Sequence, residues 1–464
     1  MKIPRILIAA PSSGSGKTMI SCGLMAAFGK QKKRVVACKC GPDYIDPMFH
    51  REVLGVDSQN LDLFFCEKEQ LTEQFIQHAK DADLAVTEGV MGYYDGMGVD
   101  TEKASSYDVA RALQMPVLLV VSAKGSALSL AALVKGFLEF QKDSRIQGIL
   151  LNRVSAMLYP RLKKMLEQEF GKAGHSIRVL GYIPEQEVFH LESRHLGLVT
   201  PQEIRHLKEQ LEKAGDILSE TVDLEGIYEL AKAAPPLAET EKEKSEKKST
   251  QVTIGVARDE AFCFYYKDNL KALEQQGCRL VSFSPLRDPH LPEGIGGLLL
   301  GGGYPELYAD ALSANRTLLM EIREKIQNGM PCHAECGGFL YLHESLEDAE
   351  GKRWNLAGVI KGAAVPKERL VRFGYVNLIG ETDGAFLRKD ETIRGHEFHY
   401  WDSTDNGSDV KAVKPDGKRS WKCIHMEENL FAGFPHLSYV SNPAFAQRFT
   451  KAAVLWEQSR ERRK

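Results

Sequence analysis

One glycine-rich segment, PSSGSGKT at residues 11–18, constrains the fold of this chain more than any other feature. It follows an apolar run at residues 6–10 that is typical of a buried β-strand, and it leads into a helix-competent stretch at residues 17–29. The phosphate-binding pattern G-x-x-x-x-G-K-[ST] is met at its last three positions, with Pro11 in place of the first glycine. This order predicts an α/β unit that binds a phosphate at a helix N-terminus.

Each residue type in the loop has an expected task. Gly14 and Gly16, with Ser15 between them, let successive backbone N–H groups face a phosphate. Lys17 adds a positive charge, and the Thr18 hydroxyl is a ligand for Mg²⁺. A plain glycine-rich turn is the alternative, but the flanking strand and helix favour ATP binding.

Two acidic segments follow later strands and supply candidates for metal binding and phosphoryl transfer. Asp43 and Asp46 come just after the second expected strand, Glu88 ends another, and Asp95 follows in a glycine-rich loop. Ligands of an open parallel sheet bind beyond the carboxyl ends of its strands, so we expect these acids to converge on the phosphate loop. A turn or cap role competes for Asp46. Buried Glu88 needs a partner to offset lost hydration, which favours a functional role.

Strand-like runs alternate with helical patterns along the chain, which indicates parallel sheets with helices on both faces. In the first half the expected strands occupy residues 6–10, 34–38, 84–87, 117–121, 148–152 and 179–183. In the second half they occupy residues 252–257, 279–283, 297–301 and 331–333. Beyond about residue 355 the pattern becomes richer in β-structure.

A charged segment separates the halves. PPLAETEKEKSEKKSTQ, at residues 235–251, has two prolines and mixed charges, and this composition cannot bury a core. A short exposed helix is the alternative and would also lie between two cores. We therefore expect a nucleotide-binding domain at residues 1–234, a linker at 235–251 and a second α/β domain at 252–464.

Composition and charge exclude several classes of protein. Sixty Lys and Arg stand against 63 Asp and Glu, and the net charge of −3 gives no basic footprint for nucleic acid or anionic membrane. The apolar runs at residues 116–121 and 295–300 are too short to span a bilayer. The first strand runs straight into the phosphate loop, unlike a signal peptide, and nine cysteines show no disulfide or zinc spacing. We expect a cytoplasmic protein without nucleic-acid or membrane partners.

The second half contains a candidate nucleophile, Cys336, in PCHAECGGFLYL at residues 331–342. A cysteine among small residues, between a short strand and a helix, is typical of a nucleophile elbow. The N-terminus of that helix favours a thiolate and presents N–H groups to an oxyanion, so Gly337 is a candidate donor. A second donor is expected from GGGYPE at residues 301–306, where Gly302 is the candidate.

A cysteine nucleophile requires a base, usually a histidine distant in sequence. His436, in AGFPHLSYVSNP, follows an expected turn and is preferred among thirteen histidines. His396 and His399, in RGHEFHY, remain alternatives. Their spacing of three residues would put them on opposite faces of a strand, which argues against a shared metal.

The combination of motifs resembles the cobyrinic acid a,c-diamide synthases, a family of CobB/CobQ-type glutamine amidotransferases. The resemblance covers nearly the whole chain and is carried, in order, by KCGPDYIDPMFH, EGVMGYYDG, GGGYPE, AECGG, GHEFHY and the His436 segment. The first half is similar to dethiobiotin synthetase and the second to class I glutaminases. The resemblance implies an α/β fold in which a P-loop synthetase domain with a parallel sheet precedes a glutaminase domain.

The resemblance also implies the chemistry of a glutamine-hydrolysing ligase of cobalamin biosynthesis. L-Glutamine would be hydrolysed through a thioester on Cys336, with His436 as base. The ammonia would pass to the nucleotide site, where ATP phosphorylates the c and then the a acetate of cobyrinic acid, and would displace phosphate to form each amide. The oligomeric state is left undecided, with a homodimer as the candidate.

By the same resemblance, Asp43, Glu88 and Asp95 fall on the family's acidic positions for Mg²⁺ and phosphoryl transfer. Thr18 joins Asp43 and Glu88 as the expected metal ligands. Tyr44 and Ile45 stand where the family contacts its corrinoid substrate.

One position departs from ordinary class I glutaminases, which have a glutamate two residues after the histidine. Ser438 occupies that position here, so another group must orient His436 or turnover is slow. Related synthases act on hydrogenobyrinic acid or nickel sirohydrochlorin with the same motifs, and these substrates remain alternatives. A ParA/MinD-like switch ATPase with an inert Cys336 is a further alternative, against which AECGG and GGGYPE argue.

Overall fold

The computed structural model describes residues 1–190, 201–238 and 249–462 of the 464-residue chain. The chain divides into two compact units, Met1–Glu241 and Lys242–Lys464, and both are α/β structures. The predicted fold class is thereby confirmed. Residues 239–248 of the expected linker lie outside the described residues. No helix within the described ranges is both long and apolar enough to cross a membrane.

The beginning of the expected linker packs against the first unit. Leu237 is buried, and its backbone exchanges hydrogen bonds with Met1: Leu237 N–H donates to Met1 O at 2.9 Å, and the Met1 ammonium donates to Leu237 O at 2.6 Å. Fully buried Arg5 donates from Nη2 to Pro235 O at 2.6 Å. The packed part of the first unit therefore extends beyond residue 234.

The first unit contains a parallel sheet with the strand order β3-β2-β4-β1-β5-β6-β7. Its strands are β1 (Arg5–Ala9), β2 (Val35–Cys40), β3 (Ser58–Leu61), β4 (Leu84–Glu88), β5 (Val117–Ser122), β6 (Ile146–Asn152) and β7 (Arg178–Ile183). All residues of β1 and β4 are buried, as expected for strands that are covered on both faces. The six strands predicted for this half are present, and only β3 was not expected.

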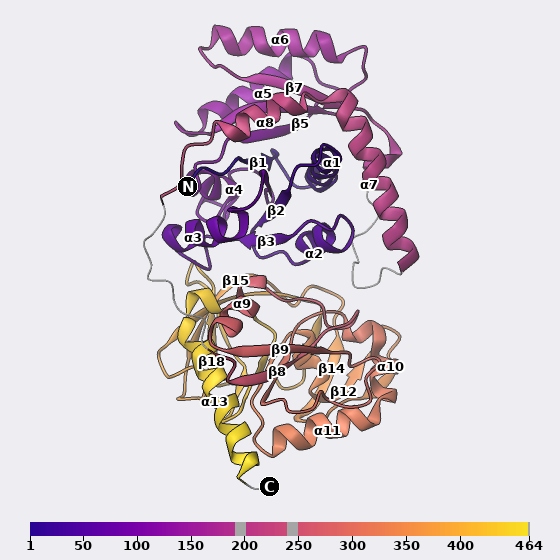
Figure 1. The fold of residues 1–464 in the computed structure, drawn as a ribbon, viewed down its shortest axis with the longest axis vertical. Coiled ribbons are helices and arrows are strands. Elements are labelled where there is room, and N and C mark those ends of the chain that lie inside the picture. The colour runs from indigo at the N-terminus through magenta and orange to yellow at the C-terminus, as the bar shows by residue number, and fades with distance from the viewer. Residues whose placement is uncertain (191–200, 239–248, 463–464) are drawn as a thin grey trace. The chain divides into compact units, whose positions relative to one another are not determined.

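Helices complete the first unit: α1 (Lys17–Lys30), α2 (Ile45–Glu52), α3 (Lys68–Ala79), α4 (Ser106–Ala112), α5 (Leu128–Glu139), α6 (Tyr159–Lys172), α7 (Pro201–Thr221) and α8 (Leu224–Lys232), with a 3₁₀ turn at Glu187–Phe189. Apolar residues of α1, α2, α7 and α8 form one core with the sheet. Because α7 lies against α1, most of α1 is buried (Figure 1). A Cβ at Gly23 would lie 2.7 Å from Leu218 Cδ1, so glycine permits this close approach.

Strand order positions the first site. β1 lies between β4 and β5, and β2 pairs with β4. Because β1, β2 and β4 are parallel, the segments that follow them leave the same edge of the sheet. These segments are the phosphate loop, the Asp43 segment and the loop after Glu88.

The second unit is built on a sheet with the order β20-β21-β11-β10-β8-β9, parallel except for β20. Its strands are β8 (Val252–Ala257), β9 (Cys278–Phe283), β10 (Gly297–Leu300), β11 (Cys332–Glu335), β20 (His425–Met426) and β21 (Leu430–Gly433). The four strands predicted here are present. Alternation along β11 places Cys332 and Ala334 in one core and directs His333 and Glu335 to the opposite face.

Two smaller sheets account for the β-rich end of the chain. A mixed sheet contains β13 (Arg353–Asn355), β12 (His343–Glu347), β14 (Ile360–Pro366) and β17 (Trp401–Ser403). An antiparallel sheet contains β19 (Ser420–Cys423), β18 (Val410–Val413), β15 (Arg372–Gly380), β16 (Thr392–His399) and β22 (His436–Ser438). In the second sheet His396 of β16 stands opposite His436 of β22.

The helices of the second unit are α9 (Lys267–Gln275), α10 (Ala309–Ala314), α11 (Arg316–Gln327), α12 (Gly337–Tyr341) and α13 (Pro443–Glu461), with 3₁₀ turns at Pro305–Tyr308 and Tyr439–Ser441. Residues of α11 and α12 pack in the core that contains Cys332 and Ala334. Residues of α9 and α13 pack in a second core, together with β8 and the antiparallel sheet. The short α12 begins immediately after Cys336.

The packing around α12 requires a glycine at position 338, and this requirement can be tested. A Cβ at Gly338 would lie 2.1 Å from Leu300 O, and Gly338 N–H donates to Gly301 O at 2.9 Å. We expect Gly338→Ala to lower the unfolding free energy by about 1–3 kcal/mol, because the backbone must move to accommodate the methyl group.

The control is Gly171→Ala in α6, where a Cβ would meet no atom within 4 Å. Alanine should stabilise this helix by about 0.5–1 kcal/mol. Calorimetric unfolding of both variants checks the prediction. A Gly338→Ala protein as stable as the wild type would contradict the packing described.

Candidate functional site

The predicted phosphate loop connects β1 to α1 and requires glycine at two positions. Gly14 and Gly16 have φ values of 74° and 82°, in the left-handed region that residues with a side chain rarely adopt. Ser15 Oγ donates to Ser12 O at 2.8 Å, and Asn152, at the end of β6, donates from Nδ2 to Ser15 O at 3.0 Å. These bonds hold the loop in a defined shape at the N-terminus of α1.

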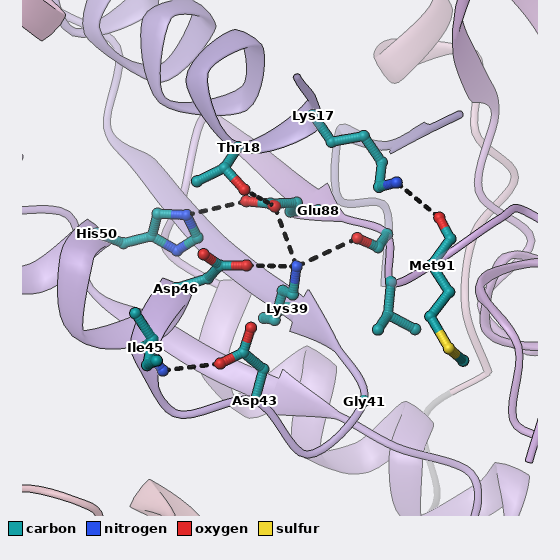
Figure 2. Close-up of polar contacts among 12 residues, drawn as sticks. Lys17, Thr18, Lys39, Gly41, Asp43, Ile45, Asp46, His50, Glu88 and Met91 are labelled. Carbon is teal, nitrogen blue, oxygen red and sulfur yellow. Dashed lines mark hydrogen bonds and ion pairs between the residues drawn. The ribbon is translucent and has the colours of Figure 1, made fainter. Parts of the chain in front are cut away.

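Lys17, the first residue of α1, spans the loop. Its Nζ donates to Met91 O at 2.6 Å (Figure 2). It also donates to Ser12 O at 3.1 Å. The side chain therefore links the phosphate loop to the loop after β4 and brings a cation to the anion-binding turn.

A buried ionic cluster lies beside this loop and centres on Lys39 of β2 (Figure 2). Lys39 Nζ lies 2.5 Å from Asp46 Oδ2 and 3.0 Å from Glu88 Oε1. Thr18 Oγ1 donates to Glu88 Oε1 at 2.6 Å, and His50 Nε2 lies 3.4 Å from Glu88 Oε2. The Lys39, Asp46 and Glu88 side chains are at most 5% exposed, so water does little to screen their charges.

These contacts fix the charge states of the cluster. Burial alone raises the pKa of Glu88, but Lys39 and then His50 outweigh it and hold that pKa well below its usual range. Burial lowers the pKa of Lys39, whereas Asp46 and Glu88 raise it above its ordinary value. The cluster is therefore an ammonium group held between two carboxylates.

The structure brings some predicted residues together and separates others. Thr18 and Glu88 meet, and Asp43 is close enough for its charge to raise the pKa of Lys39. Asp43 Oδ1 accepts the Ile45 N–H at 2.8 Å and so also shapes the start of α2 (Figure 2). Asp95 closes its own loop, where Oδ2 accepts the Gly92 N–H at 2.8 Å.

The two expected substrate residues flank the start of α2. Tyr44 is buried immediately before the helix, and Ile45, half-buried, is its first residue. Asp46 belongs to the first turn of α2, as a capping role would require, but its carboxylate contacts Lys39. It therefore serves both the helix and the ionic cluster.

Sequence reasoning missed the central cation. Lys39 lies in VVACKC, where a charge near the end of an otherwise apolar buried strand was the available signal. His50 was missed because its neighbours in sequence do not mark it; the fold of α2 alone brings it to Glu88.

Cys336 joins β11 to α12 in the sharp turn that the elbow pattern predicts. Its φ of 47° and ψ of −103° form a strained conformation for a residue with a side chain. The side chain is 8% exposed. Such a turn lifts the thiol out of the sheet while the flanking residues stay packed.

Backbone groups of two glycines lie next to this thiol. A Cβ on Gly302 would lie 2.3 Å from His436 Cε1 and 3.4 Å from Cys336 Cβ. A Cβ on Gly337 would lie 2.9 Å from Pro305 Cδ and 3.0 Å from Gly303 N. A side chain at Gly302 would therefore collide with His436, and neither position has room for a larger residue.

His436 is the histidine that meets Cys336. It is buried on β22, and its Nδ1 lies 3.5 Å from Glu335 Oε2. Burial lowers the pKa of His436, but its interactions with Cys336 and then Glu335 outweigh this effect and raise the pKa to about 10. The arrangement favours an imidazolium beside Cys336.

The two rival histidines have other surroundings. His399 stacks on Phe434 with ring centroids 3.7 Å apart, and its Nδ1 lies 2.6 Å from Trp401 O. Burial lowers the pKa of His399 to about 4 and that of His396 to about 3. Both lie in β16 three residues apart, hence on opposite faces of the strand.

The fold and the two sites define a class of two-unit α/β proteins, in which a unit with a phosphate loop is joined to a unit where a cysteine on a sharp turn lies beside a buried histidine. Family models follow the same division. Residues 6–199 match the CobQ/CobB/MinD/ParA nucleotide binding domain, and residues 253–444 match the CobB/CobQ-like glutamine amidotransferase domain.

Curated relatives match along the whole chain. A cobyrinate a,c-diamide synthase of Caldanaerobacter subterraneus subsp. tengcongensis is 40% identical, over 96% of this chain and 97% of the relative. Proteins of the same name from Clostridium acetobutylicum and Listeria innocua are 38% and 37% identical, over 96% and 95% of this chain and 99% and 97% of their own lengths. This chain belongs to the cobyrinate a,c-diamide synthase family, and the resemblance stated from its motifs is confirmed.

The ionic cluster predicts a large effect of one substitution on stability. Lys39→Met leaves Asp46 and Glu88 buried without their shared cation, which should cost about 3–5 kcal/mol of unfolding free energy near neutral pH. The pairing lowers the pKa of Glu88, so its stabilisation is complete above the ordinary value of 4.5 and is lost as pH falls below it. The difference between variant and wild type should therefore shrink in acid.

Urea unfolding at pH 7 and pH 4 measures this difference. The control is Lys135→Met, which removes an exposed pair with Glu139 at 3.7 Å and should change stability by less than about 0.5 kcal/mol. Equal losses in the two variants, or a Lys39 effect that grows in acid, would contradict the cluster as described.

Proposed function

We propose that this chain catalyses the ATP- and glutamine-dependent amidation of the a and c acetate carboxylates of cobyrinic acid, a reaction of cobalamin biosynthesis. One observation carries the proposal: a phosphate loop beside a buried acidic cluster and a Cys–His pair occur in one chain of the cobyrinate a,c-diamide synthase family. The first site suits carboxylate activation and the second suits the release of ammonia.

In the glutaminase reaction, Cys336 Sγ attacks the side-chain carbonyl carbon of L-glutamine. The thiol proton, held by His436, passes to the leaving nitrogen, so that ammonia departs and a thioester remains. Water then hydrolyses the thioester to glutamate and frees the thiol. The backbone N–H groups of Gly302 and Gly337 are the proposed oxyanion donors.

In the synthetase reaction, an acetate oxygen of the corrinoid attacks the γ-phosphorus of ATP, and ADP leaves. The carboxylate is a poor electrophile, whereas the resulting acyl phosphate is a good one, so ammonia displaces phosphate to give the amide. Gly14, Ser15 and Gly16 are proposed to cradle the phosphates, and Lys17 to balance their charge. Tyr44 and Ile45 are the proposed corrinoid contacts, and Asp95 is proposed to act in phosphoryl transfer.

The donor set beside the loop fits Mg²⁺. The Thr18 hydroxyl and the Glu88 carboxylate lie 2.6 Å apart, and Asp43 stands near the same cluster. Hard oxygen ligands of this kind suit Mg²⁺, so Thr18, Asp43 and Glu88 are the residues proposed to hold it. When bound, the ion would supply positive charge against the phosphate oxygens.

Replacing the nucleophile should separate the two reactions. Cys336→Ala is expected to lower glutamine-driven amidation by about 1,000-fold, because no thioester can form. Amidation driven by high ammonia should persist within about twofold, because the synthetase site is unchanged. Mass spectrometry of cobyrinic acid incubated with ATP, Mg²⁺ and either nitrogen source measures both rates.

Replacing Lys17, the lysine of the phosphate loop, should impair amidation and spare glutamine hydrolysis. Lys17→Met is expected to lower amidation from both nitrogen sources by about 100-fold while glutamine hydrolysis continues. The control is Lys30→Met at the other end of α1, where the exposed side chain pairs with Asp216 and activity should be unchanged.

The same experiments separate the alternatives. Glutamine hydrolysis without amidation of cobyrinic acid would redirect the assignment to hydrogenobyrinic acid or nickel sirohydrochlorin. No glutamine hydrolysis by the wild type under any condition would overturn the thiol site and favour a switch ATPase.

A further inference from the structure

We propose that Glu335 is the positioning residue of the glutaminase site: its carboxylate orients His436 in the role that Ser438 cannot fill. The proposal rests on the proposed function of the Cys336–His436 pair. A histidine that serves a nucleophile needs a partner at its second ring nitrogen, because that partner selects the tautomer and stabilises the imidazolium.

Glu335 is built into the elbow itself. It is the last residue of β11, it is 5% exposed, and it directly precedes Cys336. Its Oε2 lies 3.5 Å from His436 Nδ1, while its Oε1 accepts the Leu437 N–H at 2.9 Å. Because Leu437 follows His436 on β22, one carboxylate fixes both the imidazole and the strand that carries it.

A second layer of contacts supports the carboxylate. His333 shares a strand face with Glu335, and its Nε2 lies 3.3 Å from Glu335 Oε1. His333 Nδ1 lies 2.6 Å from the Tyr439 hydroxyl. Burial lowers the pKa of His333, which favours the neutral ring. In the tautomer with the proton on Nε2, that proton faces Glu335 Oε1, and Nδ1 can accept from the Tyr439 hydroxyl. The polar chain from Tyr439 through His333 and Glu335 thus ends at His436.

The other titratable groups around His436 do not supply this charge. Cys336 is the nucleophile, and His396 stands opposite His436 on β16 with its pKa lowered by burial. On the same strand, burial lowers the pKa of His399 and raises that of Glu397 to about 7. Glu335, by contrast, places a carboxylate oxygen 3.5 Å from His436 Nδ1.

The test is Glu335→Gln, which keeps an acceptor for the Leu437 N–H and removes the charge. We expect kcat for glutamine hydrolysis to fall by about 100-fold or more, with KM within about threefold, because the group acts through His436. Loss of the negative charge lowers the pKa of His436, so the alkaline limb of the kcat/KM profile should move to lower pH. Ammonia-driven amidation should be unchanged, which shows that the chain is folded.

Three further variants make each outcome decisive. Glu335→Asp retains the charge with a shorter reach, so its kcat and alkaline limb should lie between those of Glu335→Gln and the wild type; it also serves as the test if Glu335→Gln does not fold. Ser438→Ala is the control and should match the wild type. Cys336→Ala tests the proposed function separately. If that variant is inactive with glutamine but Glu335→Gln has wild-type kcat and pH limbs, the positioning role is overturned and the proposed function stands.

Discussion

Both units of this chain depend on the neutralisation of a buried carboxylate at the carboxyl end of a parallel strand. Glu88 ends β4 and Glu335 ends β11, and both are nearly inaccessible to water. An isolated carboxylate in such a place would lose much of its hydration, at a cost of several kcal/mol. The fold therefore has to bring cations and donors to each strand end, and the segments that do so form the two sites.

The two units meet this requirement differently. Around Glu88 the compensating groups include the permanent cation of Lys39, which another strand of the same sheet supplies. Around Glu335 they include the backbone N–H of Leu437 and the imidazole of His436, which comes from a different sheet. A lysine ammonium keeps its charge throughout phosphoryl transfer, whereas an imidazole exchanges a proton with a thiol. The choice of cation thus matches the chemistry proposed for each site.

Turns with positive φ accompany both carboxylates. In the first unit the phosphate loop places Gly14 and Gly16 at positive φ, where the absence of a side chain removes the penalty. In the second unit the turn requires positive φ at Cys336, which has a side chain. The surrounding packing, including Gly338 against Leu300, stabilises this conformation. The proposed nucleophile is therefore held in a turn that the packing of the core stabilises.

The turns that form these two sites could be predicted from the sequence, but only part of their interactions could. The phosphate loop and the cysteine elbow were predictable because each follows an apolar strand with glycines at fixed offsets. β3 was not, because SQNL is too polar to be recognised as a buried strand.

The missing interactions are those that join distant segments. Ser438 showed from sequence that His436 lacks the usual carboxylate, but the replacement precedes Cys336 by one residue and contacts His436 across 101 positions of sequence. Likewise, the ion pair between Lys39 and Glu88 can be recognised only once β2 is known to pair with β4. Spacing rules identify local turns, whereas such pairings require the sheet topology.

The most direct test of the account combines the two sites in one measurement. Wild-type protein is incubated with cobyrinic acid, ATP, Mg²⁺ and glutamine that carries ¹⁵N in its side-chain amide. The masses of the products are then measured by mass spectrometry. We expect two successive amidations, each of which incorporates one ¹⁵N from glutamine and consumes one ATP. Amidation without ATP, or product that lacks the label while glutamine is the only nitrogen source, would contradict the account.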